Sequence, residues 1–290
     1  MGELAHSIVA VLFYGLSFGA VLYLISVGLS VTMGVMNFAN LAHGVFAMAG
    51  GYLTVSLMNF EGLPFISSLI VGALGSAVLG LLLERTLFRL LYRASELRQV
   101  LFSIGIVFMA TALSRMIWGV LPQPFNLPNW LSGDVSVFGQ SLQTFRLILI
   151  IVGFGVAGFL WLLLGYSSYG ARVRAAVDHR SMAECIGINT ERLFAITFMV
   201  GCGLAGLGGG LGAATLAIHP GYAMENLVLF LIVVSVGGAK STGGPFLAAM
   251  MLGTLDAACK YFVPEIGAFA IYVAMFALLA WRPQGLFGRA

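Results

Sequence analysis

Charged side chains are scarce in this chain of 290 residues. Only 9% of its residues are Asp, Glu, Lys or Arg, whereas 60% are hydrophobic and the mean hydropathy is +1.02. A soluble domain usually carries about 25% charged residues. A single chain of this size cannot hide so much apolar surface in one core. The composition therefore excludes a water-soluble globular domain and predicts an integral membrane protein whose spans are α-helices.

Residues and motifs that support chemistry are also missing. Cysteine occurs only at Cys185, Cys202 and Cys259, without the spacing of metal ligands, so we expect neither a metal site nor a disulfide framework. The spans lack HExxH, GxSxG and paired-Asp motifs, which argues against an intramembrane enzyme. Their centres are almost empty of ionisable groups, which argues against an ion-coupled secondary transporter. No G-x-x-x-x-G-K-[ST] motif is present, so the chain cannot hydrolyse ATP through a P-loop.

What is present is a series of apolar runs separated by charges. Each run is near the ~20 residues that a bilayer requires, or somewhat shorter. The candidate spans are 8–30, 41–58, 64–84, 99–120, 146–165, 193–217, 224–239, 245–262 and 266–281. The runs 224–239 and 266–281 are marginal, and one of them suits a re-entrant segment. We therefore expect an all-α polytopic bundle of about eight to ten transmembrane helices with discontinuous or re-entrant segments, forming a single membrane domain over residues 1–290.

The cations predict how this bundle is oriented. Eleven of the 14 Lys and Arg residues lie on one side of the spans, in the loops 85–98 and 166–192, at Lys240 and in the C-terminal tail. By the positive-inside rule this side is cytoplasmic. The N-terminus and the loop 121–145 are then outside, and the C-terminus is cytoplasmic. Because the net charge of +3 follows this pattern, it indicates membrane lipid and not nucleic acid as a partner.

The cytoplasmic loop 166–192 is too polar for lipid and too patterned for a passive tether. An apolar stripe on a helix of about 15 residues is expected there, with arginines and acidic residues on the other faces; it consists of Val173, Ala176, Val177, Met182, Ala183 and Ile186. Gly187 fits the left-handed position just past a helix end, and Asn189 fits as N-cap of the next helix. A helix lying on lipid is the alternative. The acidic residues among the arginines favour a docking surface for a cytoplasmic partner.

Four stretches of the chain occur in the order found in one transporter family. They are GVMNFANLAHGVFAMAGGY, RAAVDHRSMAECIGIN, VGGAKSTGGPFLAAMMLG and WRPQGLFGR. Together they resemble the branched-chain amino acid ABC transporter permeases of the LivH/LivM type, with a spacing closer to LivH. Two departures from the family pattern are three extra residues before His43 and Lys240 at a position that is commonly Gly.

The resemblance implies a working unit of several chains in the bacterial cell inner membrane. This chain would be a transmembrane permease without a cofactor of its own. Its partners would be a second permease subunit (a LivM-like chain or a second copy), two P-loop ATPase subunits that bind ATP and Mg, and a periplasmic substrate-binding protein. The expected substrate is a small polar solute, with branched-chain or other amino acids first, and urea, short amides or aromatic carboxylates as alternatives. The loop 166–192 would couple to the ATPases, with candidate residues Arg174, Ala176, Asp178, Ala183, Glu184, Gly187 and Asn189.

The first candidate for the substrate pathway lies in the longest uncharged run, between Leu4 and Phe60. Its candidate residues are Asn37, Asn40, His43 and Gly44. At 100° per residue the two amides and the imidazole would share one face of a helix. Asn40 also fits as the cap of a helix beginning near Leu41, which would aim a positive helix end at a carboxylate. The alternative is that these side chains make interhelical hydrogen bonds or lie at an interface.

A second glycine-interrupted segment echoes the first. Residues 242–253 (TGGPFLAAMMLG) resemble residues 42–53 (AHGVFAMAGGYL) in the order of small and bulky residues. Transporters often carry broken segments at corresponding positions of two halves, near the substrate path. The candidate residues are Gly237, Gly238, Lys240, Ser241, Gly244 and Pro245.

Two more patterns concern packing inside the bundle. The glycine-rich run 201–212 has small residues at spacings that permit close approach of helices. Asp256 and Lys260 are four residues apart and are placed to neutralise each other on one helix face. The alternative for this pair is proximity to the outer interface.

Overall fold

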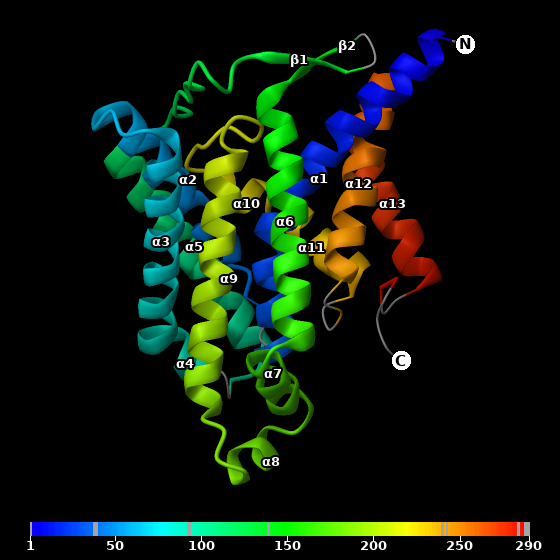
Figure 1. Cartoon of the computed structure of the whole chain (residues 1–290). Helices are drawn as coiled ribbons and strands as arrows, with labels where there is room; N and C mark the ends of the chain where they lie inside the picture. The colour runs from blue at the N-terminus through cyan, green and yellow to red at the C-terminus, as the bar shows by residue number, and fades with distance from the viewer. Residues whose placement is uncertain are drawn as a thin grey trace.

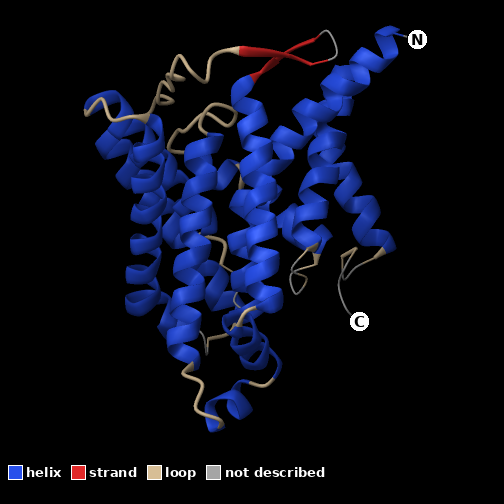
Figure 2. Ribbon diagram, viewed as in Figure 1, coloured by secondary structure: helices blue, strands red, loops and turns tan. Residues whose placement is uncertain are grey.

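The computed structural model describes residues 2–36, 40–91, 94–137, 140–238, 241, 243–282 and 285–286 as a bundle of helices (Figures 1 and 2). The helices are α1 (Gly2–Met36), α2 (His43–Phe60), α3 (Phe65–Leu83), α4 (Arg89–Leu91), α5 (Glu96–Trp118), α6 (Thr144–Tyr166), α7 (Ser168–Asp178), α8 (Arg180–Cys185), α9 (Thr190–Gly212), α10 (Tyr222–Glu225), α11 (Leu227–Gly237), α12 (Gly244–Phe262) and α13 (Pro264–Trp281). A π-helical turn, Glu84–Phe88, joins α3 to α4.

The described helices confirm an all-α polytopic membrane protein. Five of them are long and apolar enough to cross a bilayer, within His6–Gly34, Phe65–Leu91, Glu96–Trp118, Thr144–Tyr166 and Thr190–Gly212, and two shorter apolar segments are Tyr222–Gly237 and Phe269–Trp281. A helix of 23 residues, such as α5, is about 35 Å long, against about 30 Å of hydrocarbon. With 35 residues, α1 is longer than the span predicted at 8–30 and takes up much of the uncharged run.

The glycine-rich helix α9 is the central packing element. It packs against α1, α2 and α3. A Cβ added at Gly209 would overlap the Ala47 carbonyl of α2, and one added at Gly28 of α1 would overlap the Gly201 carbonyl of α9. Such overlaps mean that the backbones touch where only glycine fits, as the run of small residues predicts. On the other side of α1, α12 packs along its length, and the ring of Tyr23 lies edge-on to Phe246 at 5.2 Å.

The two ends of the bundle differ. Part of the segment predicted as the loop 121–145 forms two short antiparallel strands, β1 (Asp134–Val137) and β2 (Gln140–Gln143), with Asp134 opposite Gln143. Figure 2 shows this hairpin at the end where the N-terminus lies, whereas α7 and α8 project from the opposite end. The two segments predicted to lie on opposite sides of a membrane are therefore separated by the full length of the bundle.

Candidate coupling surface and transport pathway

The segment 166–192 folds as two short helices and not as one. His179 has φ −146° and ψ 86°, so the helical path breaks between α7 and α8. The break lets apolar residues of both helices reach α9, where Val173, Ala176 and Ala183 form a small buried cluster with Leu193 and Phe194. A straight helix would carry residue 183 about 15 Å along its axis from residue 173. The prediction of a single helix of about 15 residues is therefore wrong.

The division of the apolar stripe leaves some of its members outside the cluster. Met182 and Ile186 are 69% and 72% exposed, respectively. Of the coupling candidates, Ala176 and Ala183 lie buried beneath the surface, whereas Arg174, Asp178 and Glu184 are exposed. The end of the molecule therefore presents two large apolar side chains surrounded by charges.

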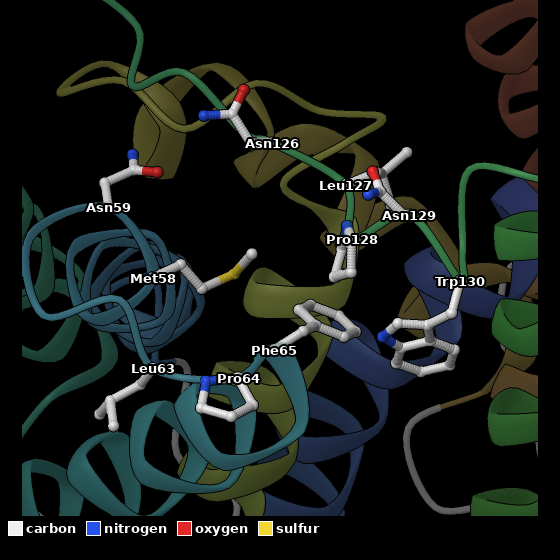
Figure 3. A pocket seen from close by; sticks show the side chains of 10 residues that line it. All are labelled: Met58, Asn59, Leu63, Pro64, Phe65, Asn126, Leu127, Pro128, Asn129 and Trp130. Carbon is white, nitrogen blue, oxygen red and sulfur yellow. The ribbon is translucent and has the colours of Figure 1, made fainter.

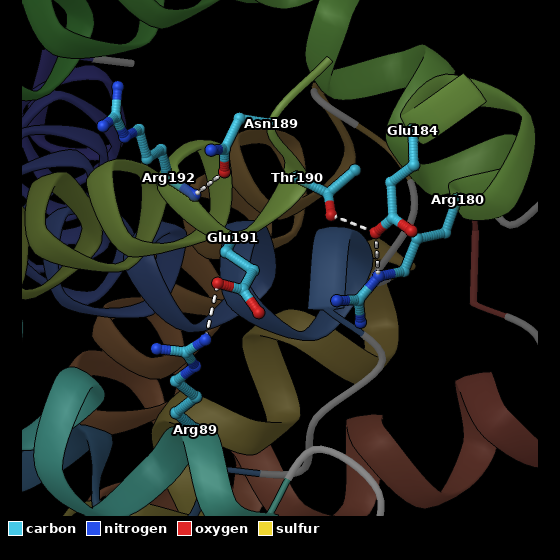
Figure 4. A network of polar contacts seen from close by, with 7 residues as sticks. All are labelled: Arg89, Arg180, Glu184, Asn189, Thr190, Glu191 and Arg192. Carbon is cyan, nitrogen blue, oxygen red and sulfur yellow. Dashed lines mark hydrogen bonds and ion pairs between the residues drawn. The ribbon is translucent and has the colours of Figure 1, made fainter. Parts of the chain in front are cut away.

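The exit from α8 and the start of α9 follow the local signals. Gly187 has φ 86°, and its N–H donates to the Glu184 carbonyl at 3.1 Å. The side-chain oxygen of Asn189 accepts a hydrogen bond from the backbone N–H of Arg192 at 2.9 Å (Figure 4). Both structural predictions for this turn are confirmed. Only glycine adopts such a φ without strain, and the cap satisfies one of the free N–H groups at the start of α9.

A network of polar side chains connects this turn to α4, α8 and α9 at the same end of the bundle (Figure 4). Glu184 accepts hydrogen bonds from Arg180 at 3.1 Å and from the Thr190 hydroxyl at 2.5 Å. Glu191, in the first turn of α9, pairs with Arg89 of α4 at 2.6 Å. This second pair links residues that are 102 positions apart, so no periodicity in the sequence could predict it.

A further contact fixes α7 to α9 from within. The Tyr169 hydroxyl lies 2.6 Å from the Thr197 hydroxyl, and burial raises the pKa of Tyr169 above its usual value. Arg174 donates a hydrogen bond to the Leu164 carbonyl near the end of α6. α7 is therefore connected through side chains to both long helices that flank the segment.

The first pathway candidate forms a buried turn before α2. Asn37 lies outside the described residues. Asn40 is fully buried, and its side-chain oxygen accepts a hydrogen bond from the Ala42 N–H at 3.0 Å. Helix α2 begins at His43 with Ala42 as its N-cap. The prediction that Asn40 caps a helix beginning near Leu41 is therefore wrong: its amide closes a local turn ahead of the helix, a common alternative for Asn.

His43 and Gly44 lie where α2 meets α1 and α10. The imidazole is fully buried, and its Nε2 donates to the Ile25 carbonyl of α1 at 3.1 Å. A Cβ added at Gly28 would lie 2.9 Å from the His43 ring, and one added at Gly44 would lie 2.9 Å from the Ala223 carbonyl of α10. The His43 bond is of the interhelical kind, and it joins α2 to α1.

Several polar atoms around this junction have no hydrogen-bond partner in the described part of the chain. They are the Asn40 amide nitrogen, His43 Nδ1, the Tyr222 hydroxyl and the Ser26 hydroxyl. A buried polar group without a partner costs free energy, and more so within a membrane. These four atoms come from α1, α2, α10 and the turn before α2, so several elements contribute polar groups to this region.

The second glycine-interrupted segment brings α11 close to the start of α12. A Cβ at Gly237 would lie 2.5 Å from the Pro245 nitrogen, and Gly238 has φ 84°. The Ser241 hydroxyl accepts a hydrogen bond from the Gly244 N–H at 3.0 Å. Lys240 lies outside the described residues. Like α2, α12 therefore starts directly after residues that are not helical.

The C-terminal motif contacts this segment, which sequence reasoning did not foresee. The Leu286 N–H donates to the Val236 carbonyl at 2.8 Å. Gly285, with φ 81°, lies so close to Ser235 that an added Cβ would be 2.5 Å from its carbonyl oxygen. Two of the four recognised stretches thus meet in space.

A cavity of about 490 Å³ opens at the hairpin end (Figure 3). It lies between the α2–α3 connection and the segment before β1, with lining residues Met58, Asn59, Leu63, Pro64, Phe65, Asn126, Leu127, Pro128, Asn129 and Trp130. The Asn59 amide donates to the Pro124 carbonyl at 2.9 Å, which holds the two walls together.

Comparison with known proteins identifies the kind of molecule to which this geometry belongs. Residues 11–279 match the family model described as "Branched-chain amino acid transport system / permease component". The chain belongs to this family. It is therefore a multi-pass membrane permease component and not an enzyme, in agreement with the motifs that are present and those that are missing.

Relatives of this permease match over nearly the whole length. The high-affinity branched-chain amino acid transport system permease protein LivH of Salmonella typhimurium is 29% identical, over 96% of this chain and 94% of its own. The corresponding protein BraD of Pseudomonas aeruginosa is 25% identical, over 95% and 94%. The structure titled PsaBC from Streptococcus pneumoniae in complex with Fab has a TM-score of 0.51 at 12% identity, over 92% of this chain and 89% of that chain. At such low identity this last likeness concerns the fold alone.

Proposed function

We propose that this permease is the transmembrane subunit of an ABC importer, and that it moves branched-chain or other amino acids into the cell. ATP hydrolysis on partner subunits drives the movement. The observation that carries the proposal is the α7–α8 pair, which projects from one end of the bundle with Met182 and Ile186 exposed above a cluster buried against α9. Exposed apolar side chains within a charged surface are typical of a protein contact.

The proposal assigns a partner to each end of the bundle. Two P-loop ATPase subunits, with bound ATP and Mg, receive the α7–α8 ends of two permease subunits, either this chain and a related one or two copies. A periplasmic binding protein delivers substrate at the hairpin end. The N-terminus then lies outside the bacterial inner membrane, and the α7–α8 end and the C-terminus lie in the cytoplasm. The distribution of cations supports this orientation.

Movement reaches the pathway through α9. The ATPases shift α7 and α8, and the links Tyr169–Thr197 and Arg89–Glu191 carry the shift into α9 and α4. Because α9 touches α1 and α2 through glycine, a small displacement changes the junction around His43. The unsatisfied atoms at that junction supply the polar lining that a solute requires.

The test is reconstitution with the partner subunits and measurement of ATP-dependent uptake of radiolabelled L-leucine. Met182→Glu places a charge at the proposed apolar contact, so uptake and binding-protein-stimulated ATPase activity should fall, whereas membrane insertion persists. Met182→Leu is the matched control, because it keeps an apolar side chain of similar volume at the same position and should couple as wild type. Normal coupling in Met182→Glu would contradict the assignment of the α7–α8 end. Absence of ATP-dependent uptake by the wild-type complex for every amino acid tried would contradict the function itself.

A further inference from the structure

A second cavity, of about 650 Å³, lies between α1, α6, α12 and α13. Its volume is within the range of small-molecule sites, about 300–1,000 Å³. Its charged residues come from the first turn of α6 and the last turns of α12, and these helix ends lie toward the end of the bundle where the N-terminus lies (Figure 1). Its walls include Arg146 of α6 and the pair Asp256 and Lys260 of α12. Such charges are rare within a membrane bundle and mark functional positions by default.

Arg146 is a cation that has no ionic partner among the described residues. Its guanidinium lies 4.6 Å from the centre of the Tyr14 ring, and it donates hydrogen bonds to Gln143 at 3.0 Å and to Ser17 at 3.3 Å. Within the described residues, no carboxylate lies within 4.0 Å of it. The neutral partners use only part of a donor set that carries five N–H groups. A guanidinium forms its strongest hydrogen bonds with the oxygens of a carboxylate or phosphate, so an oxyanion is the ligand that matches its free N–H groups.

Among the described residues that line the cavity, Asp256 is the only carboxylate. Its side chain is 9% exposed, whereas that of its partner Lys260 is 57% exposed, with 2.7 Å between Nζ and the carboxylate. The Lys260 ammonium also lies 5.5 Å from the centre of the Phe18 ring. The carboxylate is therefore held in place, and the ammonium paired with it is at the surface on a flexible stem that can give way to another ammonium.

The two cationic groups face adjacent turns of one helix. Tyr14, beside Arg146, and Phe18, beside Lys260, are four residues apart on α1, so their Cβ atoms are about 5–6 Å apart. Arg146 and the Asp256–Lys260 pair therefore approach neighbouring turns of α1 in one cavity, where a small molecule that carries both an acid group and an ammonium can meet both. The rest of the lining near them is apolar and includes Leu229 and Ile271.

We propose that this cavity binds a zwitterion, with its acid group on Arg146 and its ammonium on Asp256 in place of Lys260. Two sources of this chemistry also fit the apolar remainder of the lining: a free apolar amino acid, and the headgroup of phosphatidylethanolamine. The first source rests on the proposed function, in which the cavity holds an amino acid on its way from the binding protein. The second makes the cavity a lipid site.

The free-amino-acid source is tested with the assembled transporter in nanodiscs, without the binding protein. Tritiated L-leucine is the probe, and two competitors each lack one group: N-acetyl-L-leucine lacks the ammonium, and L-leucinol lacks the acid. Arg146→Gln should weaken L-leucine and N-acetyl-L-leucine about tenfold or more but leave L-leucinol unchanged. Asp256→Asn should weaken L-leucine and L-leucinol but leave N-acetyl-L-leucine unchanged. A general loss of folding cannot produce this crossed pattern.

Matched controls and a lipid assay complete the design. Arg115→Gln and Glu265→Gln remove an exposed charge of each sign outside the cavity, and both should bind as wild type. Arg146→Lys keeps the charge and should restore part of the affinity for N-acetyl-L-leucine. Native mass spectrometry compares retained phosphatidylethanolamine with phosphatidylcholine, whose quaternary ammonium cannot donate a hydrogen bond to Asp256. Preferential retention that is lost in Arg146→Gln, without leucine binding, would assign the lipid headgroup.

Equal binding of leucine and its analogues by all variants, together with equal retention of both lipids, would overturn the zwitterion site. Uptake by the wild-type complex, measured in parallel, separates this result from the proposed function. Normal uptake, with leucine binding and lipid retention both unchanged in Arg146→Gln, removes the site and leaves the importer. If the two variants show the crossed binding pattern but the wild-type complex shows no ATP-driven uptake, the binding site is retained and the importer function is rejected.

Discussion

Replacement of Gly187 by valine tests whether the turn between α8 and α9 transmits coupling. At φ 86° a residue with a Cβ is strained, and valine is more strained than most because it is branched at Cβ. A Cβ at Gly187 would meet nothing within 4 Å, so the cost is the backbone term alone, about 1–2 kcal/mol. A cost of this size lowers the population of the native turn by a factor of about 5–30.

The effect should appear first in the turn and then in transport. In Gly187→Val, the N–H groups of residues 187 and 188, which donate to Glu184 and Ala183 at 3.1 and 3.0 Å, should exchange hydrogen faster. Leucine uptake and substrate-stimulated ATPase activity should fall, whereas insertion into the membrane is unchanged. Gly187→Asn should recover most of the activity, because asparagine tolerates a positive φ better than other residues.

Gly165→Val provides the matched control. A Cβ at this position also meets nothing within 4 Å, but Gly165 lies in α6 and does not have a positive φ. We expect activity near that of the wild type. Normal exchange and normal transport in Gly187→Val, or an equal defect in Gly165→Val, would refute the reasoning that connects the positive φ to coupling.

Three other outcomes are expected. Asn40→Leu should lower uptake but leave complex assembly and basal ATPase activity intact, and Asn40→Asp, which keeps the oxygen that accepts from Ala42, should be less impaired; normal uptake by Asn40→Leu would count against the pathway. After replacement of the native cysteines, a cysteine at Ser132 should react with an impermeant thiol reagent from outside and one at Ser181 only from the cytoplasm, and reaction of both from one side would reverse the orientation. A double-mutant cycle on Arg89 and Glu191 should give less than about 1 kcal/mol, decreasing with salt, because both side chains are more than half exposed; a larger, salt-independent value would contradict this.

Structural features that depend on residues close together in the chain were predicted well from the sequence. The positive φ of Gly187, the Asn189 cap and the Asp256–Lys260 pair all depend on residues within four positions of one another. The same reasoning was wrong for the α7–α8 helix and for Asn40. In both cases the chain leaves the helical path: at His179 so that two apolar groups reach α9, and at Asn40 so that its amide closes a turn. Contacts with α9 decide the first case, and they lie outside any local window.

The sequence by itself determined that this protein is a multi-spanning helical permease, because hydropathy, the scarcity of charge and four ordered motifs are properties of the chain alone. Only the tertiary structure decided which groups meet. It placed His43 against Ile25 of α1, the C-terminal residues 285–286 against the end of α11, and Arg146 in one cavity with Asp256. The members of each pair are far apart along the chain. Their proximity depends on where glycine allows helices to approach, which only the packed bundle specifies.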